Sequence, residues 1–302
     1  MKSWLRLLRV SLAPSAAADA IAGLVFGHGG LPIDPRAWWL VGASLGVYHG
    51  ALVLNDWHDR RHDAHTRGSR PIPSGAISAA SALALAIGLF AAGIVCAFLV
   101  SPSVAAWMSV VALSAVVYDL AGRGPWLGPI LLATCRAGNL GAGIFVAHQS
   151  GVLDVPVTLA CVAPLLYGAY VFHVSRLGRF EDGEDLHDLA RRPRALLIVA
   201  ALCLAALALT PAPTPAHIRW VAFVLALAGG FGLVRAALTR EPWTRAGVER
   251  AMGLALRRLL VASAVVALLG VRSDAYAGAV AASVILLGFP LSHALRRVAP
   301  PS

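Results

Sequence analysis

The polar residues at the end of the second apolar stretch have types and a spacing that suit metal chemistry. Asn55, Asp56, Asp59 and Asp63 follow one another there. If the stretch is a continuing α-helix, each residue advances by about 100°, so these side chains share one face about 100° wide. Carboxylates crowded on one face repel each other unless a cation lies among them, and oxygen ligands near a phosphate suit Mg²⁺. The spacing therefore predicts a divalent cation site at a helix end.

A loop rich in arginine and proline follows this helix end. It reads Arg-Gly-Ser-Arg-Pro-Ile-Pro-Ser-Gly from Arg67 to Gly75. Pro71, Pro73 and Gly75 restrict or bend the backbone in this loop. An ordinary solvated helix end with mixed charges is the alternative interpretation, and the attached proline loop argues against it.

Together the two segments resemble the first acidic motif and the succeeding loop of the UbiA superfamily of intramembrane aromatic prenyltransferases. The matching pattern is Asn-Asp-x-x-Asp-x-x-x-Asp followed by Ser-Arg-Pro-Ile-Pro-Ser-Gly. The resemblance implies that Asn55, Asp59 and Asp63 hold Mg²⁺ against a prenyl diphosphate, with Asp56 beside them. It also makes the aspartates Asp59 and Asp63 essential for catalysis.

Four further residues are candidates for substrate binding. Arg67 and Arg70 are the best diphosphate ligands in the loop, because a planar guanidinium can grip phosphate oxygens with two hydrogen bonds. Arg136 and Asn139 lie three residues apart inside an apolar stretch, so they share a helix face. They resemble the polar patch that the family directs toward its diphosphate or its acceptor. A structural pair that satisfies a helix contact is the equal alternative.

A second acidic segment matches the place of the family's second motif. It contains Glu181, Asp182, Asp185 and Asp188, in a loop predicted on the same side of the membrane as the first motif. The resemblance implies that Asp182, Asp185 and Asp188 hold a second Mg²⁺, with Asp185 needed for catalysis. Glu181 stands where aspartate is usual and Gly183 interrupts the run, so a solvated acidic loop is the alternative.

The composition indicates an all-α integral membrane protein. The 302 residues are 58% hydrophobic and 13% charged, and the mean hydropathy is +0.74. Soluble domains contain about 45–50% apolar residues. Ten stretches approach the ~20 residues that cross a bilayer. These predicted spans are 10–27, 37–56, 77–99, 103–121, 127–148, 154–175, 194–210, 216–237, 246–270 and 275–293.

The basic residues predict how these spans are oriented. With a cytoplasmic N-terminus, only Arg36, Arg219 and Arg272 fall in outside loops, as the positive-inside rule requires. We therefore expect residues 1–302 to form one polytopic domain in a cell inner membrane, with the active-site loops cytoplasmic. The family core has nine helices and would cover about 10–270, so 275–293 would be a tenth. The net charge of +10 is attributed to topology and anionic lipid, and not to nucleic acid.

These observations favour a Mg²⁺-dependent prenyltransferase that moves a prenyl group from a prenyl diphosphate to a small lipophilic acceptor of unknown identity. A non-catalytic scaffold or transporter with the same fold is the second candidate. A membrane di-iron enzyme, suggested by His58, His62 and His65, is disfavoured because no comparable second histidine cluster follows. The four cysteines lie in apolar stretches without Cys-x-x-Cys spacing, so neither disulfides nor zinc are expected.

Overall fold

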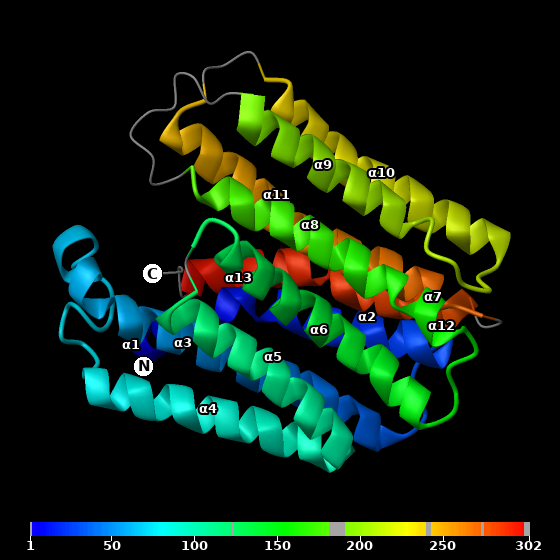
Figure 1. Ribbon diagram of the computed structural model, residues 1–302, viewed down its shortest axis with the longest axis horizontal. Helices are drawn as coiled ribbons and strands as arrows, with labels where there is room; N and C mark the ends of the chain where they lie inside the picture. The colour runs from blue at the N-terminus through cyan, green and yellow to red at the C-terminus, as the bar shows by residue number, and fades with distance from the viewer. Residues whose placement is uncertain (1, 123, 181–190, 240–242, 273–274, 299–302) are drawn as a thin grey trace.

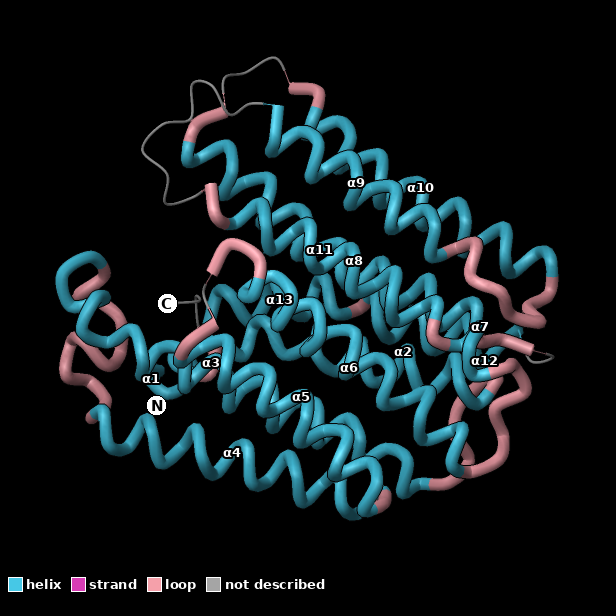
Figure 2. The backbone as a smooth tube through the Cα atoms, in the orientation of Figure 1, coloured by secondary structure: helices cyan, strands magenta, loops and turns pink. Residues whose placement is uncertain are grey.

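The protein is a bundle of long helices. The structure, a computed structural model, describes residues 2–122, 124–180, 191–239, 243–272 and 275–298. Within these ranges the regular elements are all helical. The long helices run along one axis, and the connecting loops gather at the two ends (Figures 1 and 2). The predicted all-α membrane fold is thereby confirmed.

The helices follow the predicted spans closely. In chain order they are α1 (Lys2–Leu7), η1 (Val10–Leu12), α2 (Ala13–His28), η2 (Pro35–Trp38), α3 (Trp39–Thr66), α4 (Ala79–Val100), α5 (Pro102–Leu120), α6 (Leu127–Gln149), α7 (Val157–Ala160), α8 (Val162–Gly178), α9 (Arg191–Leu207), α10 (Ala216–Ala237), α11 (Arg245–Leu269), α12 (Ala275–Leu286) and α13 (Gly288–Val298).

Prolines and capping side chains set several of these boundaries. Pro164 has no N–H to donate to the carbonyl of Ala160, where α7 ends, and Pro290 has none for Leu286, where α12 ends. Ser101 caps α5 by accepting a hydrogen bond from the amide of Val104 at 3.1 Å. The predicted spans 154–175 and 275–293 are therefore each broken into two helices.

Burial separates central from peripheral helices. In the most apolar part of each helix, 67% of residues are buried in α11 and 61% in α2, against 17% in α4. Figure 1 agrees, because α4 lies at one edge of the bundle and α9 and α10 at the opposite edge. Apolar residues on the peripheral helices are left exposed, as a lipid-facing surface requires. The central helices are thus those that can carry polar side chains inside the bundle.

Helix length explains why the acidic motif lies at one end. With 28 residues, α3 is about 42 Å long, well beyond the ~30 Å hydrocarbon core. A helix of this length can extend beyond the apolar layer at one end, and its last turns carry the motif. The loop after α3, the end of α8 and the α5–α6 turn meet at this same end (Figure 1).

Nine helical segments of the described residues are long and apolar enough to cross a membrane. The segment Arg191–Leu207, at 17 residues, is the predicted span that is not among them. α1 and the end of α13 lie at the same end of the bundle (Figure 1), as an even number of passes would give. Ten crossings therefore stay a prediction.

We expect a reporter fused after Ser302 to be cytoplasmic, because an even number of crossings returns the chain to its starting side. Alkaline phosphatase and green fluorescent protein fusions measure this directly. A matched fusion after Leu31, between α2 and α3, should read on the outside. A C-terminal fusion on the outside would show that the chain crosses an odd number of times.

Candidate active site

Ion pairs hold the charged end of α3. Asp56 and Asp63 are seven residues apart, two helical turns, and each is only 3% exposed. Arg70 Nη1 lies 2.5 Å from Asp63 Oδ2 and 3.4 Å from Asp56 Oδ1. Arg9 Nη2 lies 2.5 Å from Asp56 Oδ1. Two carboxylates and two guanidinium groups therefore form one cluster, which we call the acid–arginine cluster.

The loop after α3 is anchored so that Arg70 points back at the helix. Ile72 and Ile77 are buried and pack in one apolar cluster with Val53 of α3. The amide of Ile77 donates to the carbonyl of Pro71 at 3.0 Å, which closes the loop on itself. Because two isoleucines hold the loop against α3, Arg70 is itself 8% exposed and reaches the carboxylates.

A turn with left-handed backbone geometry brings Arg9 to the same place. Arg9 has a φ of 47°, and it is the one non-glycine with positive φ in the described part of the chain. Such a conformation is uncommon for a residue with a side chain and costs about 1 kcal/mol or more. Next to it, the carbonyl oxygen of Leu8 lies 2.7 Å from Nδ1 of His49 and accepts its hydrogen bond, and Leu7 is fully buried. These contacts hold the turn beside α3.

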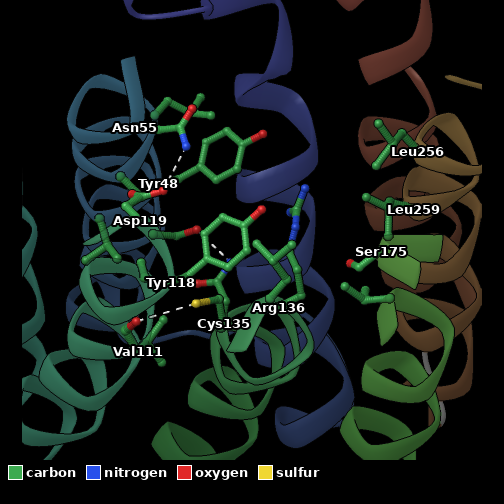
Figure 3. Close-up of a pocket in the computed structure, with 18 of the residues that line it drawn as sticks. Tyr48, Asn55, Val111, Tyr118, Asp119, Cys135, Arg136, Ser175, Leu256 and Leu259 are labelled. Carbon is green, nitrogen blue, oxygen red and sulfur yellow. Dashed lines mark hydrogen bonds between the residues drawn. The ribbon is translucent and has the colours of Figure 1, made fainter. Parts of the chain in front are cut away.

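Asn55 lies on the cavity side of the same helix end. Its Nδ2 donates to Asp119 Oδ1 of α5 at 3.0 Å (Figure 3). Asn55, Asp119, Tyr118 and Arg9 all line one cavity of about 320 Å³. Since Arg9 also pairs with Asp56, the acid–arginine cluster adjoins this cavity.

Away from that polar mouth the cavity is largely apolar. Its walls come from α3, α5, α6, α8 and α11, and include Val47, Met108, Val111 and Val171. We call it the apolar cavity. Its lining can hold a hydrocarbon chain, with the acid–arginine cluster next to one end.

Arg136 reaches the apolar cavity from a buried polar network. Its Nη1 lies 2.7 Å from Asp19 Oδ2, and Asp19 is fully buried. Asp19 Oδ1 also accepts hydrogen bonds from the hydroxyls of Tyr167 at 2.6 Å and Ser263 at 2.9 Å. The guanidinium of Arg136 lies 5.1 Å from the centre of the Tyr48 ring. Four helices, α2, α6, α8 and α11, are joined by this one carboxylate.

Close packing of α2 on α6 positions this network. A side chain at Gly23 would overlap the carbonyl oxygen of Leu140, and one at Gly143 would overlap the backbone of Gly23 and Leu24. Small residues at such a crossing let two helix backbones approach. Because the two backbones lie close together, Nδ2 of Asn139 on α6 can donate to the carbonyl of Ala16 on α2 at 3.1 Å.

The sequence model of the UbiA prenyltransferase family matches residues 16–260. The chain belongs to this family. The prediction of a UbiA prenyltransferase is thereby confirmed at the level of the family. The described fold agrees, because the UbiA homologue of Archaeoglobus fulgidus bound to DMAPP and Mg²⁺ superposes with a TM-score of 0.63 at 14% identity. That superposition covers 98% of this chain and 99% of the homologue.

The relatives of this UbiA family member carry names that indicate different acceptors. Digeranylgeranylglyceryl phosphate synthase of Saccharolobus solfataricus is 28% identical over 195 residues, covering 63% of this chain and 67% of the relative. Protoheme IX farnesyltransferase 1 of Pyrobaculum aerophilum is 28% identical over 253 residues, covering 79% of this chain and 84% of the relative.

The structure brings part of the predicted site together. Asp56, Asp63 and Arg70 meet in the acid–arginine cluster, and Asn55 lies at the mouth of the apolar cavity. Asp59 is half-buried on the same helix. In the described part of the chain, no group of three or more His, Cys, Asp or Glu side chains is placed to hold one metal ion. The metal ligand set therefore stays a prediction.

Other predicted residues have different surroundings. Arg67 is exposed at the end of α3. Asp182, Asp185 and Asp188 lie outside the described residues. Arg136 and Asn139 both line the apolar cavity and both make helix contacts, so each alternative predicted for them has support.

Sequence reasoning missed Arg9 and Asp19, and it noted Asp119 only as a charge at the end of an apolar span. Arg9 was assigned only to topology, and it reaches Asp56 across 47 positions. The signal for Asp19 and Asp119 was an ionisable residue within or at the end of an apolar span, which is rarely without function. Their partners, however, come from distant helices and leave no spacing pattern.

Proposed function

We propose that this chain is a Mg²⁺-dependent membrane prenyltransferase that uses a prenyl diphosphate and a lipophilic acceptor. The observation that carries the proposal is the acid–arginine cluster at the polar mouth of the apolar cavity. A prenyl diphosphate has the same division, a charged head and an apolar tail. In the reaction the carbon–oxygen bond to the diphosphate breaks, the acceptor forms a new bond to that carbon, and the acceptor loses a proton.

The donor set fits Mg²⁺ in its chemistry. Asn55, Asp56 and Asp63 offer only oxygen ligands, and carboxylates this well buried need positive charge beside them. Arg9 and Arg70 supply that charge to Asp56 and Asp63. Asn55, Asp59 and Asp63 would hold the ion, with Asp56 beside them, and bound Mg²⁺ would neutralise charge that develops on the diphosphate leaving group.

The chain's own arginines have a second role in this proposal. Arg9 and Arg70 would bind phosphate oxygens of the diphosphate, for which the guanidinium fork is suited. Exposed Arg67 is close enough in sequence to Arg70 to join them. Tyr48 and Tyr118 line the cavity, and their ring faces can stabilise positive charge on the prenyl carbon. The apolar walls exclude water from it.

Three finer parts of the proposal rest on sequence and on relatives. Asp182, Asp185 and Asp188 would complete the site as a second carboxylate group. The charge asymmetry of the loops supports a site at the cytoplasmic face of the membrane, which we propose to be a cell inner membrane. The relatives named above suggest a glycerophosphate or a porphyrin as types of acceptor.

A scaffold or transporter is the second candidate. The observation in its favour is that Asp56 and Asp63 already pair with arginines, so the cluster is neutralised without a metal. The two candidates differ in whether the cluster exchanges these partners for Mg²⁺ and diphosphate.

We expect saturable, Mg²⁺-dependent binding of dimethylallyl S-thiolodiphosphate, a non-hydrolysable donor analogue, to the chain in lipid nanodiscs. Transition-state stabilisation by a metal is worth several kcal/mol, so Asp185→Asn should lower turnover on the order of a hundredfold or more. It should also weaken Mg²⁺-dependent analogue binding. Turnover is measured with labelled prenyl diphosphates and a native membrane extract, with product identification by mass spectrometry.

The control is Glu249→Gln, an exposed carboxylate that pairs with Arg245 on the surface of α11. It should bind the analogue as the unmodified chain does. If the unmodified chain binds no analogue with Mg²⁺ present and Asp185→Asn behaves the same, the scaffold or transporter interpretation replaces the enzyme.

A further inference from the structure

A second cavity, of about 300 Å³, lies beside the apolar cavity and has a different character. Three arginines line it: Arg136 from α6, Arg257 from α11 and Arg296 from α13. Ser11 and Ser292 add hydroxyl groups. None of the described residues that line it is acidic. We call it the basic cavity.

The positive charge in the basic cavity is not compensated by described residues. Arg136 pairs with Asp19, but Arg257 and Arg296 have no carboxylate partner within the described part of the chain. Instead, Arg257 and Arg296 line the same cavity, so two like charges face one space. Like charges held together at a bundle surface disfavour the arrangement unless an anion lies between them.

Two buried polar atoms in the cavity wall also lack a partner among the described residues. The hydroxyl of Ser11, a fully buried residue, makes no hydrogen bond to any of them, and neither does Nε of Arg296. A buried donor without an acceptor costs free energy, so a water, an ion or a ligand that accepts from these groups would stabilise the cavity wall. Two guanidinium groups and a hydroxyl are donors of the kind that bind phosphate or carboxylate oxygens.

The C-terminal helix builds one wall of this cavity. The break before Gly288 lets α13 turn across η1 and α2, where Ser292 Oγ donates to the carbonyl of Ser11 at 2.5 Å. Arg296 follows Ser292 by four residues, so both lie on the same helix face. The family match ends at residue 260, so α13 lies beyond the matched region.

The two cavities meet at a shared set of residues. Tyr48, Arg136, Leu256 and Leu259 line both. In Figure 3, Leu256 and Leu259 lie on the opposite side of the apolar cavity from Tyr48 and Arg136. An amphiphile whose head group lies in the basic cavity would therefore extend into the apolar cavity. The atoms next to its head group would then lie close to the prenyl chain of the donor.

We propose that the basic cavity binds the anionic head group, a phosphate or a carboxylate, of the amphiphilic acceptor. This inference rests on the proposed prenyl transfer and narrows its acceptor to an anionic lipid-like molecule. It also gives α13 a function, because Arg296 would be one of the two arginines without a carboxylate partner that select the anion.

The test uses hexyl phosphate as the probe and hexanol as its uncharged match, with the full chain in phosphatidylcholine nanodiscs. We expect saturable binding of hexyl phosphate and none of hexanol. The double variant Arg257→Gln/Arg296→Gln should weaken hexyl phosphate binding by about tenfold or more, as expected for lost charge-assisted hydrogen bonds. Arg297→Gln is the matched control, since Arg297 is the neighbour of Arg296, is exposed, and does not line the cavity.

Binding of dimethylallyl S-thiolodiphosphate with Mg²⁺ separates this inference from the proposed function. The double variant should keep it, which also shows that the variant is folded. A chain that binds the donor analogue but not hexyl phosphate, or a double variant that binds hexyl phosphate normally, would overturn the inference alone. A chain that binds hexyl phosphate but not the donor analogue would overturn the proposed reaction instead.

A bilayer phospholipid is the other source of an anionic head group. In nanodiscs that contain equal parts of phosphatidylcholine and phosphatidylglycerol, hexyl phosphate should bind as it does in phosphatidylcholine alone. If phosphatidylglycerol displaces it, the basic cavity is a site for a membrane lipid head group, and the acceptor assignment is wrong.

Discussion

Replacing Asp63 with Asn is expected to abolish most prenyl transfer while the chain still inserts into the membrane. Asn has nearly the same size, so α3 keeps its packing, but it carries no charge to hold a cation. Loss of metal stabilisation in the transition state should cost on the order of a hundredfold or more in turnover. Asp63 also pairs with Arg70 at 2.5 Å, so its charge positions the arginine that we assign to the diphosphate.

The measurement is the rate of product formation at saturating Mg²⁺, together with Mg²⁺-dependent binding of the donor analogue. Thermal unfolding is followed alongside, because the amide oxygen of the substituted side chain can still accept a hydrogen bond from Arg70 and the chain should remain folded. Glu249→Gln again serves as the surface control and should retain full turnover. An active Asp63→Asn enzyme would count strongly against the metal site proposed here.

The local part of this site could be predicted from the sequence because its geometry is helical. Asp56 and Asp63 are two turns apart on α3, so spacing alone places them on one face of the helix. The contact of Arg70 with both depends on how the loop after α3 folds back, which spacing does not give. The long apolar helices were predictable for a similar reason, since crossing a bilayer demands about 20 apolar residues.

The partners from distant helices could not be predicted in the same way. Asn55 meets Asp119 across 64 positions, and Arg136 meets Asp19 across 117. These pairs depend on which helices pack together and at what height, and a single sequence carries no periodicity that encodes either. The breaks in two spans were readable in principle, because Pro164 and Pro290 stand a few residues after each break.

Removing one partner of the buried ion pair between Asp19 and Arg136 should be one of the most destabilising single substitutions in the fold. Asp19 is fully buried and its two oxygens accept from Arg136, Tyr167 and Ser263. In Asp19→Asn, an amide group would face these donors and Arg136 would lose its counter-charge. Removing one partner of a buried pair costs about 3–5 kcal/mol, and we expect a loss of that size in the free energy of unfolding.

Reversible unfolding in mixed micelles measures this loss, and Asp154→Asn is the matched control. Asp154 also pairs with an arginine, Arg272 at 2.8 Å, but its side chain is 47% exposed, so its loss should cost about 1 kcal/mol or less. The double variant Asp19→Asn/Arg136→Gln should recover part of the stability, because it removes the uncompensated charge. Equal effects of Asp19→Asn and Asp154→Asn would mean that the buried pair does not hold α2 against α6, and that packing at Gly23 and Gly143 alone orients Arg136 toward the two cavities.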